Sequence, residues 1–107
     1  MSTIYLVQGD TRPQLQVTAT REGGSVIDLT DSTVLLKIRR KNIRGITLTL
    51  TGTLSDPTNG VAVFAFSDGD LDIDAGDYQG EVEVTYSTGD IETAYDLVDI
   101  NLRRDFE

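Results

Sequence analysis

The stretch DAGDYQG, residues 74–80, stands directly before an alternating run of acidic and apolar residues, EVEV, at residues 81–84. Strict alternation of this kind predicts a half-buried β-strand, with one face toward a core and the other toward water. The sequence therefore predicts that Val82 and Val84 face the core while Glu81 and Glu83 face water.

The same period of two recurs on both sides of this strand. Alternating apolar residues appear in four more runs, at residues 15–20, 33–38, 46–51 and 98–103. The run VAVFAF at residues 61–66 is apolar on both faces, which predicts a central strand with Phe64 and Phe66 in the core. The apolar phase shifts between Tyr95 and Val98, and this shift predicts a bulge near Asp96-Leu97.

Turn signals separate these runs and indicate how the chain folds. They are Gly23-Gly24, Asp31-Ser32, the stretch 56–60 (DPTNG) and the stretch 87–90 (STGD). Seven or eight short antiparallel strands separated by turns predict an all-β, two-sheet sandwich. The length of 107 residues suits one domain, so we expect a single domain over residues 1–107.

The spacing Asp-x-Gly-x-Tyr at residues 74–78, just before the strand at residues 81–84, resembles the entrance to the F strand of immunoglobulin-like domains. The resemblance implies a tyrosine corner, in which the tyrosine hydroxyl bonds back to the backbone a few residues upstream, so Asp74, Gly76 and Tyr78 are expected to be structural residues. Gly80 occupies the place of the second cysteine of an antibody domain, and the chain contains no cysteine. The resemblance therefore implies an immunoglobulin-like β-sandwich without the disulfide.

The amino-acid composition excludes most kinds of catalytic site. The chain has no histidine and no cysteine, so it has no Ser-His-Asp or Cys-His arrangement, and it contains no glycine-rich phosphate loop. We expect no enzyme activity, no cofactor and no small-molecule substrate. The formal net charge of −9 makes nucleic acid and membrane surfaces poor partners. The N-terminus carries no signal-peptide pattern, which predicts synthesis and residence in the cytoplasm.

Four acidic residues have a spacing that suits calcium. Asp70, Asp72, Asp74 and Glu81 fall at positions 1, 3, 5 and 12 of a helix-loop-helix calcium loop. Position 6 is Ala75, where that loop requires glycine, and no helical pattern flanks the segment. The sequence therefore predicts no metal site, and leaves a calcium ion on these four acids as an alternative to a solvated loop.

Basic residues gather in one short segment. Five of the nine lie between residues 37 and 44, and these are Lys37, Arg39, Arg40, Lys41 and Arg44. We expect this basic stretch to face an acidic partner surface, with two solvated faces of different charge as the alternative. The first strand (Ile4–Val7) and the last (Val98–Leu102) are expected at open sheet edges, where either can pair with a neighbouring subunit.

A family resemblance adds a specific role. The order of LVQGDTRP (residues 6–13), the strand 15–20, VIDLT (26–30), the strand 34–39 and GDYQGEV (76–82) is similar to the N-terminal immunoglobulin-like domain of phage baseplate upper proteins and to small phage virion proteins. The resemblance covers residues 4–102 and implies a non-enzymatic virion subunit, either a tail, baseplate or neck adaptor or a capsid decoration protein. It implies other virion proteins as partners, in symmetric multiple copies, and location in the virion.

Two binding functions of another class remain as alternatives. A carbohydrate-binding module would need exposed aromatic residues, and Tyr5 and Tyr95 are the candidates. A calcium-dependent adhesion domain would use the four acids between residues 70 and 81.

Overall fold

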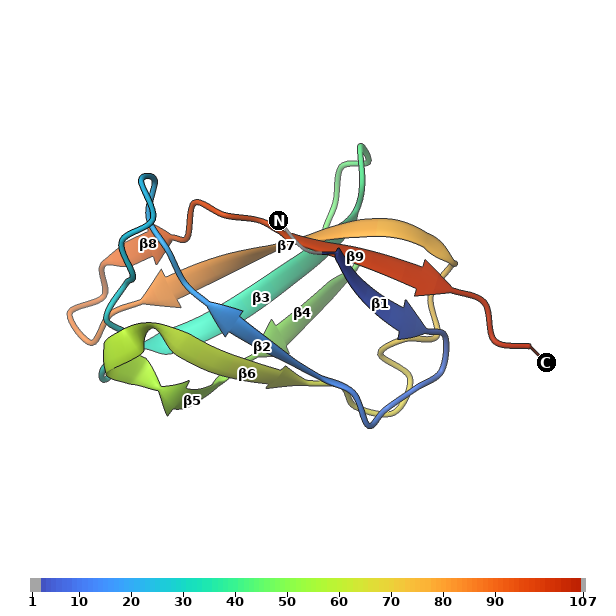
Figure 1. The fold of residues 1–107 in the computed structure, drawn as a ribbon, viewed down its shortest axis with the longest axis horizontal. Helices are drawn as coiled ribbons and strands as arrows, with labels where there is room; N and C mark the ends of the chain where they lie inside the picture. The colour runs from blue at the N-terminus through green and yellow to red at the C-terminus, as the bar shows by residue number, and fades with distance from the viewer. Residues whose placement is uncertain (1–2, 107) are drawn as a thin grey trace.

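The computed structural model describes residues 3–106 as a sandwich of two β-sheets with extents of 45 × 25 × 23 Å (Figure 1). The larger sheet has six strands in the order β1-β9-β7-β3-β4, with β8 also paired to β7, and the smaller sheet has the order β2-β6-β5. The strands are β1 (Thr3–Val7), β2 (Gln14–Thr18), β3 (Thr33–Arg40), β4 (Leu48–Thr51), β5 (Thr53–Asp56), β6 (Val61–Ala65), β7 (Gly76–Thr85), β8 (Ile91–Thr93) and β9 (Val98–Arg103). The predicted all-β, two-sheet sandwich is confirmed. Residues 1, 2 and 107 of the expected domain lie outside the described residues.

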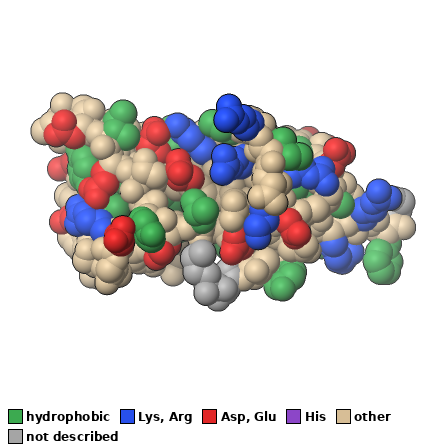
Figure 2. All heavy atoms as spheres, turned by 90° about the horizontal axis from the view of Figure 1, so that it is seen from above, with side chains coloured by type: hydrophobic (Ala, Val, Ile, Leu, Met, Phe, Trp, Pro, Cys, Tyr) green, Lys and Arg blue, Asp and Glu red, His purple; other side chains and the backbone are tan. Residues whose placement is uncertain are grey.

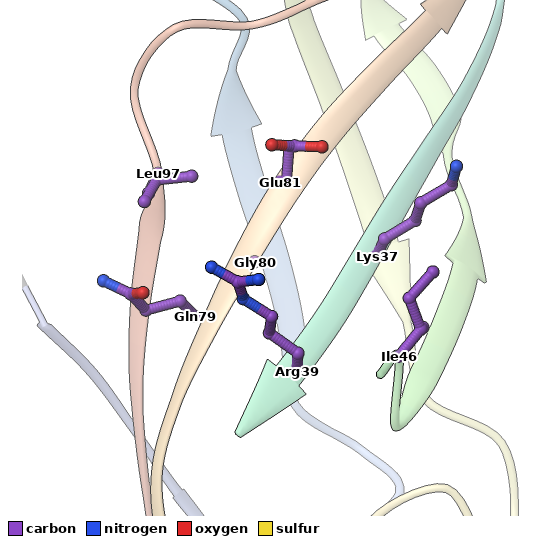
Figure 3. Close-up of a pocket in the computed structure, with 7 residues that line it drawn as sticks. All are labelled: Lys37, Arg39, Ile46, Gln79, Gly80, Glu81 and Leu97. Carbon is purple, nitrogen blue, oxygen red and sulfur yellow. The ribbon is translucent and has the colours of Figure 1, made fainter. Parts of the chain in front are cut away.

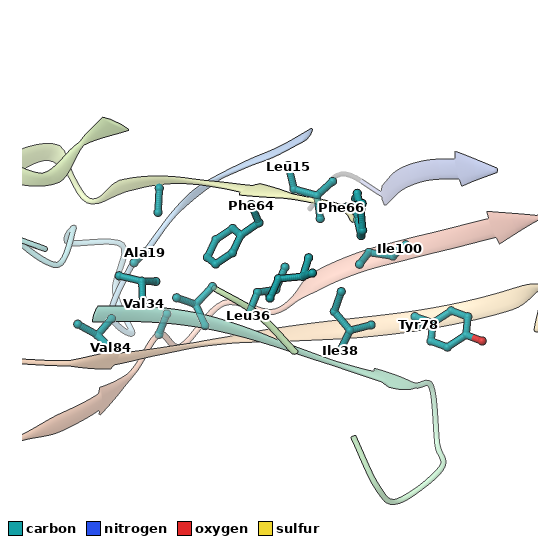
Figure 4. Packing of buried hydrophobic residues seen from close by; sticks show 14 of the residues in the cluster. Leu15, Ala19, Val34, Leu36, Ile38, Phe64, Phe66, Tyr78, Val84 and Ile100 are labelled. Atoms are coloured by element: carbon teal, nitrogen blue, oxygen red, sulfur yellow. The ribbon is translucent and has the colours of Figure 1, made fainter. Parts of the chain in front are cut away.

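Alternation of apolar and polar residues places one set of side chains between the sheets. Phe64 of β6, Leu36 of β3 and Val84 of β7 are fully buried and point into this layer (Figure 4). Phe66 is also buried, as the sequence predicts. Each large apolar side chain that leaves water contributes roughly 1.5–3 kcal/mol, so this layer is the main source of stability.

The chain changes sheets at Gly52, which separates β4 of the larger sheet from β5 of the smaller one. A Cβ atom at Gly52 would lie 2.8 Å from Cε1 of Phe64, closer than any side chain tolerates. The Gly52 N–H donates to the carbonyl oxygen of Val34 (2.8 Å), which fixes the crossing against β3. Only glycine lets the backbone pass this close to the central phenylalanine.

The bulge predicted near Asp96-Leu97 separates β8 from β9. Between the pairs Glu83↔Thr93 and Gly80↔Val98, two residues of β7 stand opposite the four residues 94–97. The Ala94 N–H still donates to the carbonyl oxygen of Val82 in β7 (2.9 Å), whereas the Tyr95 N–H donates to the carbonyl oxygen of Thr20 (2.8 Å). The bulge therefore ties the larger sheet to the segment that follows β2.

Four expectations about the strands need correction. Residues 3–106 form nine strands rather than seven or eight, because residues 53–56 and 91–93, which lie outside the alternating runs, form the further strands β5 and β8. The pairing is not wholly antiparallel, since β1 runs parallel to β9. Strand β9 therefore lies between β1 and β7, so Val98–Leu102 is not an open edge. Strand β4 begins at Leu48, and Ile46 lies before it with its side chain 58% exposed.

The turn predicted at residues 56–60 forms a 3₁₀ turn, η1 (Pro57–Asn59). Gly60 closes it with φ of 74°, a left-handed value that favours glycine, and its N–H donates to the carbonyl oxygen of Pro57 (3.0 Å). Within residues 3–106, no helix has the length and apolar character needed to cross a membrane.

Candidate functional site

The tyrosine corner forms as the resemblance to immunoglobulin-like domains implies. The Tyr78 hydroxyl donates to the carbonyl oxygen of Asp74 at 2.5 Å, and the ring is buried between the sheets. Burial raises the pKa of Tyr78, and the positive charge of Arg40 partly offsets this rise. The corner fixes the turn into β7 and so sets the register of the strand at the centre of the larger sheet.

Arg40 belongs to this corner and not to an open basic surface. Its guanidinium lies 5.9 Å from the centre of the Tyr78 ring, and Nη2 donates to the carbonyl oxygen of Ala75 at 3.1 Å. Nη1 lies 3.6 Å from Oδ2 of Asp74. Gly76 leaves the room that Arg40 needs, because a Cβ atom at Gly76 would lie 2.8 Å from Nη2.

The structure divides the basic stretch into two groups. Lys37 forms an ion pair with Glu83 at 2.8 Å, and Arg40 is held in the tyrosine corner. Arg39, Lys41 and Arg44 form no ion pair within residues 3–106. From above, Lys and Arg side chains lie mainly over the middle and right of the molecule, and Asp and Glu side chains predominate at the left (Figure 2).

Arg39 projects into a hollow on the outer face of the larger sheet (Figure 3). The hollow has a volume of about 160 Å³ and opens to solvent. Ile46 and Leu97 form apolar walls on its two sides, and Gly80 contributes backbone to its floor. The remaining polar lining comes from Lys37, Gln79 and Glu81.

The bulge and the β3–β4 connection explain why a hollow forms there. At the bulge the chain leaves the edge of β7, so no paired strand lies beside Glu81 on that side. Leu97 stands directly before Val98, where pairing with β7 resumes. On the opposite side, Gly45 has φ of 96° and turns the chain so that Ile46 stands outside the strand. The outer face is thus open in the middle and bounded by two apolar side chains.

The four calcium candidates are not brought together. The carboxylate of Asp70 accepts a hydrogen bond from the backbone N–H of Ser67 (2.7 Å), and Asp74 lies against Arg40. Glu81 lines the hollow on the outer face of β7. In residues 3–106, no group of three or more His, Cys, Asp or Glu side chains has the arrangement to hold a metal ion.

Sequence analysis missed an ion-pair cluster at the opposite end of the sandwich. Arg21 binds Glu92 through two hydrogen bonds, Nε to Oε2 (2.6 Å) and Nη2 to Oε1 (2.9 Å). The Tyr86 hydroxyl donates to Oε1 of Glu92 at 2.6 Å. The hydrogen bond from Arg21 lowers the pKa of Glu92, with a second contribution from Tyr86. Arg21 and Glu92 lie 71 positions apart, so no local pattern in the sequence reveals the pair.

Comparison with known proteins gives a likeness to solved structures and none to a protein family. No family model and no curated protein matches the chain. The fold is similar to the crystal structure of CopC from Methylosinus trichosporium OB3b, with a TM-score of 0.51 and 11% sequence identity over 100% of this chain and 89% of that chain. At this identity the likeness shows the fold alone.

This comparison corrects the expected function. CopC, whose solved structure is similar to this chain, is not a protein of a phage particle, which contradicts the expected virion subunit in both its tail and its capsid forms. The carbohydrate-binding alternative has no support either. Its two candidate residues, Tyr5 and Tyr95, are exposed but lie in different segments, since Tyr5 is in β1 and Tyr95 is in the bulge between β8 and β9. The resemblance to phage baseplate domains finds no matching family.

Proposed function

We propose that the chain is a non-enzymatic protein-binding module that docks an acidic segment of a partner in the hollow around Arg39. The observation that carries this proposal is the position of Arg39: its guanidinium lies in an outward hollow and forms no ion pair within residues 3–106. An arginine in this setting offers a planar set of five donors to a carboxylate. The favoured ligand is therefore an Asp or Glu side chain of a protein.

The walls of the hollow specify the rest of the ligand. Ile46 is 58% exposed, and Leu97 faces it across the hollow. Water that covers these apolar surfaces is released when an apolar side chain packs on them, which is favourable. We therefore infer a segment in which an acidic residue stands next to a leucine or phenylalanine.

Charge on the surrounding face favours a segment over a large acidic surface. Lys37 is already neutralised by Glu83, and Glu81 lines the hollow with a negative charge. A broad acidic surface would be repelled by these carboxylates and by the overall charge of −9. A single carboxylate placed on Arg39 avoids most of this repulsion.

A peptide array tests this function. The array carries short peptides with Asp or Glu beside Leu or Phe, and matched peptides in which Gln or Lys replaces the acid. We expect the protein to bind the acidic set, and Arg39→Glu to weaken binding about tenfold or more, because a charged hydrogen bond contributes roughly 1.5–3 kcal/mol.

Arg104→Glu is the matched control, since it makes the same charge change in the exposed segment after β9. We expect this control to bind as the unchanged protein does. Equal binding of the acidic and Gln-containing peptides, or full binding by the Arg39→Glu variant, would overturn the proposal.

A further inference from the structure

Strand β1 leaves one edge of the larger sheet open. In the described part of the chain it pairs on one side only, with β9, and stands at the end of the strand order (Figure 1). Its sequence, TIYLV, contains no charged residue, proline or glycine. Those are the features with which proteins protect an edge from pairing, so this edge is unprotected.

The hydrogen-bonding groups on this edge follow from the register. The Gln8 N–H donates to the carbonyl oxygen of Arg103 (3.0 Å), so backbone groups of even-numbered residues in β1 point toward β9. The N–H and C=O groups of Tyr5 consequently point outward. On the same edge, the Val7 carbonyl oxygen accepts from the Asp10 N–H at 3.3 Å, and the Val7 N–H remains outward.

We propose that two copies of the chain associate through β1, in an antiparallel pair centred on Tyr5 that joins the two larger sheets into one. In this arrangement the two Tyr5 residues exchange both of their backbone hydrogen bonds, as a directly opposed pair does. Each Val7 N–H donates to the Thr3 carbonyl oxygen of the other copy. The contact is the same on both copies, as two-fold symmetry requires.

Charge favours a second copy at this edge. With a net charge of −9, two copies repel each other over most of their surface, but β1 itself is uncharged. Asp99 stands opposite Thr3 and Arg103 stands opposite Val7 in each copy. An antiparallel pair therefore puts Asp99 of one copy in the same row as Arg103 of the other, whereas a parallel pair would align like charges.

The side chain of Tyr5 separates β1 from the other edge strands that carry no charge, β2 and β4. Tyr5 is 77% exposed, while the exposed side chains are Gln14, Gln16 and Thr18 on β2 and Thr49 and Thr51 on β4. Two aromatic side chains directly opposed across antiparallel strands stabilise the pair by roughly 0.2–1 kcal/mol, and glutamine or threonine offers no comparable surface. The pairing is thus specific to β1.

The two-fold symmetry provides the test, because the residue at position 5 of one copy must lie opposite the residue at position 5 of the other. We expect sedimentation equilibrium to show a concentration-dependent dimer for the unchanged chain. Tyr5→Lys and Tyr5→Glu, each measured alone, should be monomers because like charges stand opposed. An equal mixture of the two variants should form a dimer again.

Disulfide trapping adds a second readout that does not depend on a charge change. The chain has no cysteine, and directly opposed Cα atoms about 5.5 Å apart suit a disulfide. Tyr5→Cys should oxidise to a covalent dimer much faster than Gln16→Cys, a control on the exposed edge strand β2. The proposal is overturned if the unchanged chain stays monomeric at every concentration, if the mixture of charged variants stays monomeric, or if the two cysteine variants oxidise at the same rate.

Discussion

The hydroxyl of Tyr78 donates to the carbonyl oxygen of Asp74, four residues upstream, while Arg40 covers the face of the same ring. This contact joins the turn before β7 to the end of β3, the two strands with the longest pairing in the sheet. Together with the buried side chains of Phe66 and Leu71, the corner therefore fastens the loop of residues 66–75 to the core. It also engages the guanidinium of Arg40 within the chain, although the side chain stays 38% exposed.

Loss of the corner hydrogen bond should lower stability without changing the fold. We expect Tyr78→Phe to reduce the free energy of unfolding by about 1 kcal/mol, because a buried hydrogen bond is lost and the ring is kept. Urea unfolding measures the change. Tyr95→Phe is the control, since the Tyr95 hydroxyl makes no hydrogen bond within residues 3–106. Equal effects of the two substitutions would show that the corner is not structural.

Arg39 and Arg40 should differ in their effect on stability, because Arg40 is a structural residue and Arg39 is the proposed binding residue. Arg40→Gln should lower the free energy of unfolding by about 1 kcal/mol, a value reduced for the partial exposure of its side chain. Arg39→Gln should leave stability within about 0.5 kcal/mol, as exposed positions usually do. Thermal unfolding of the two variants side by side checks this, and a larger loss for Arg39→Gln would reverse the assignment.

Gly52 should accept no side chain. We expect Gly52→Ala to cost about 1–3 kcal/mol, because the added Cβ atom overlaps the ring of Phe64. The cause can be isolated with a double-mutant cycle that includes Phe64→Leu, in which the alanine should cost much less. If Gly52→Ala cost the same in the Phe64→Leu background as in the unchanged chain, contact with the ring would not be its cause.

The Arg21–Glu92–Tyr86 cluster should make stability depend on pH. The pKa of Glu92 is lower in the folded chain than its ordinary value, so its contribution is present above that ordinary value. The contribution is lost as the pH falls through the lowered pKa of the folded state. The free energy of unfolding should therefore differ between the unchanged chain and Glu92→Gln at neutral pH, and this difference should shrink in acid.

Glu22→Gln provides the control for this cluster, because it removes the same charge from an exposed position nearby. Urea unfolding at a series of pH values compares the three proteins. A gap between the unchanged chain and Glu92→Gln that stays constant down to the acid limit would contradict the role of the ionised carboxylate.

The repeated period of two in the sequence was enough to predict most strands and the core. Val34, Leu36 and Ile38 are all buried, because alternation on β3 is undisturbed and the strand is paired on both sides. The phase shift before Val98 located the bulge for the same reason. Such features are local, and side-chain alternation reports them directly.

Relationships between distant segments could not be predicted in the same way. Parallel pairing of β1 with β9 joins residues at opposite ends of the chain, and alternation does not specify the direction of a partner strand. The five basic residues look equivalent in the sequence, yet Arg40 is held by Tyr78 and Ala75 while Arg39 is not. That difference arises from which face of β3 each side chain occupies and from the turn that packs beside it.

The most direct test of the central claim is an NMR titration of the isotope-labelled protein with the acidic peptide that binds best on the array. The account predicts that backbone amide shifts concentrate at Arg39, Gln79, Glu81 and Leu97, with the residues of β2 and β5 unchanged. Shifts that spread over the smaller sheet, or that persist unchanged in Arg39→Glu, would contradict docking in the hollow.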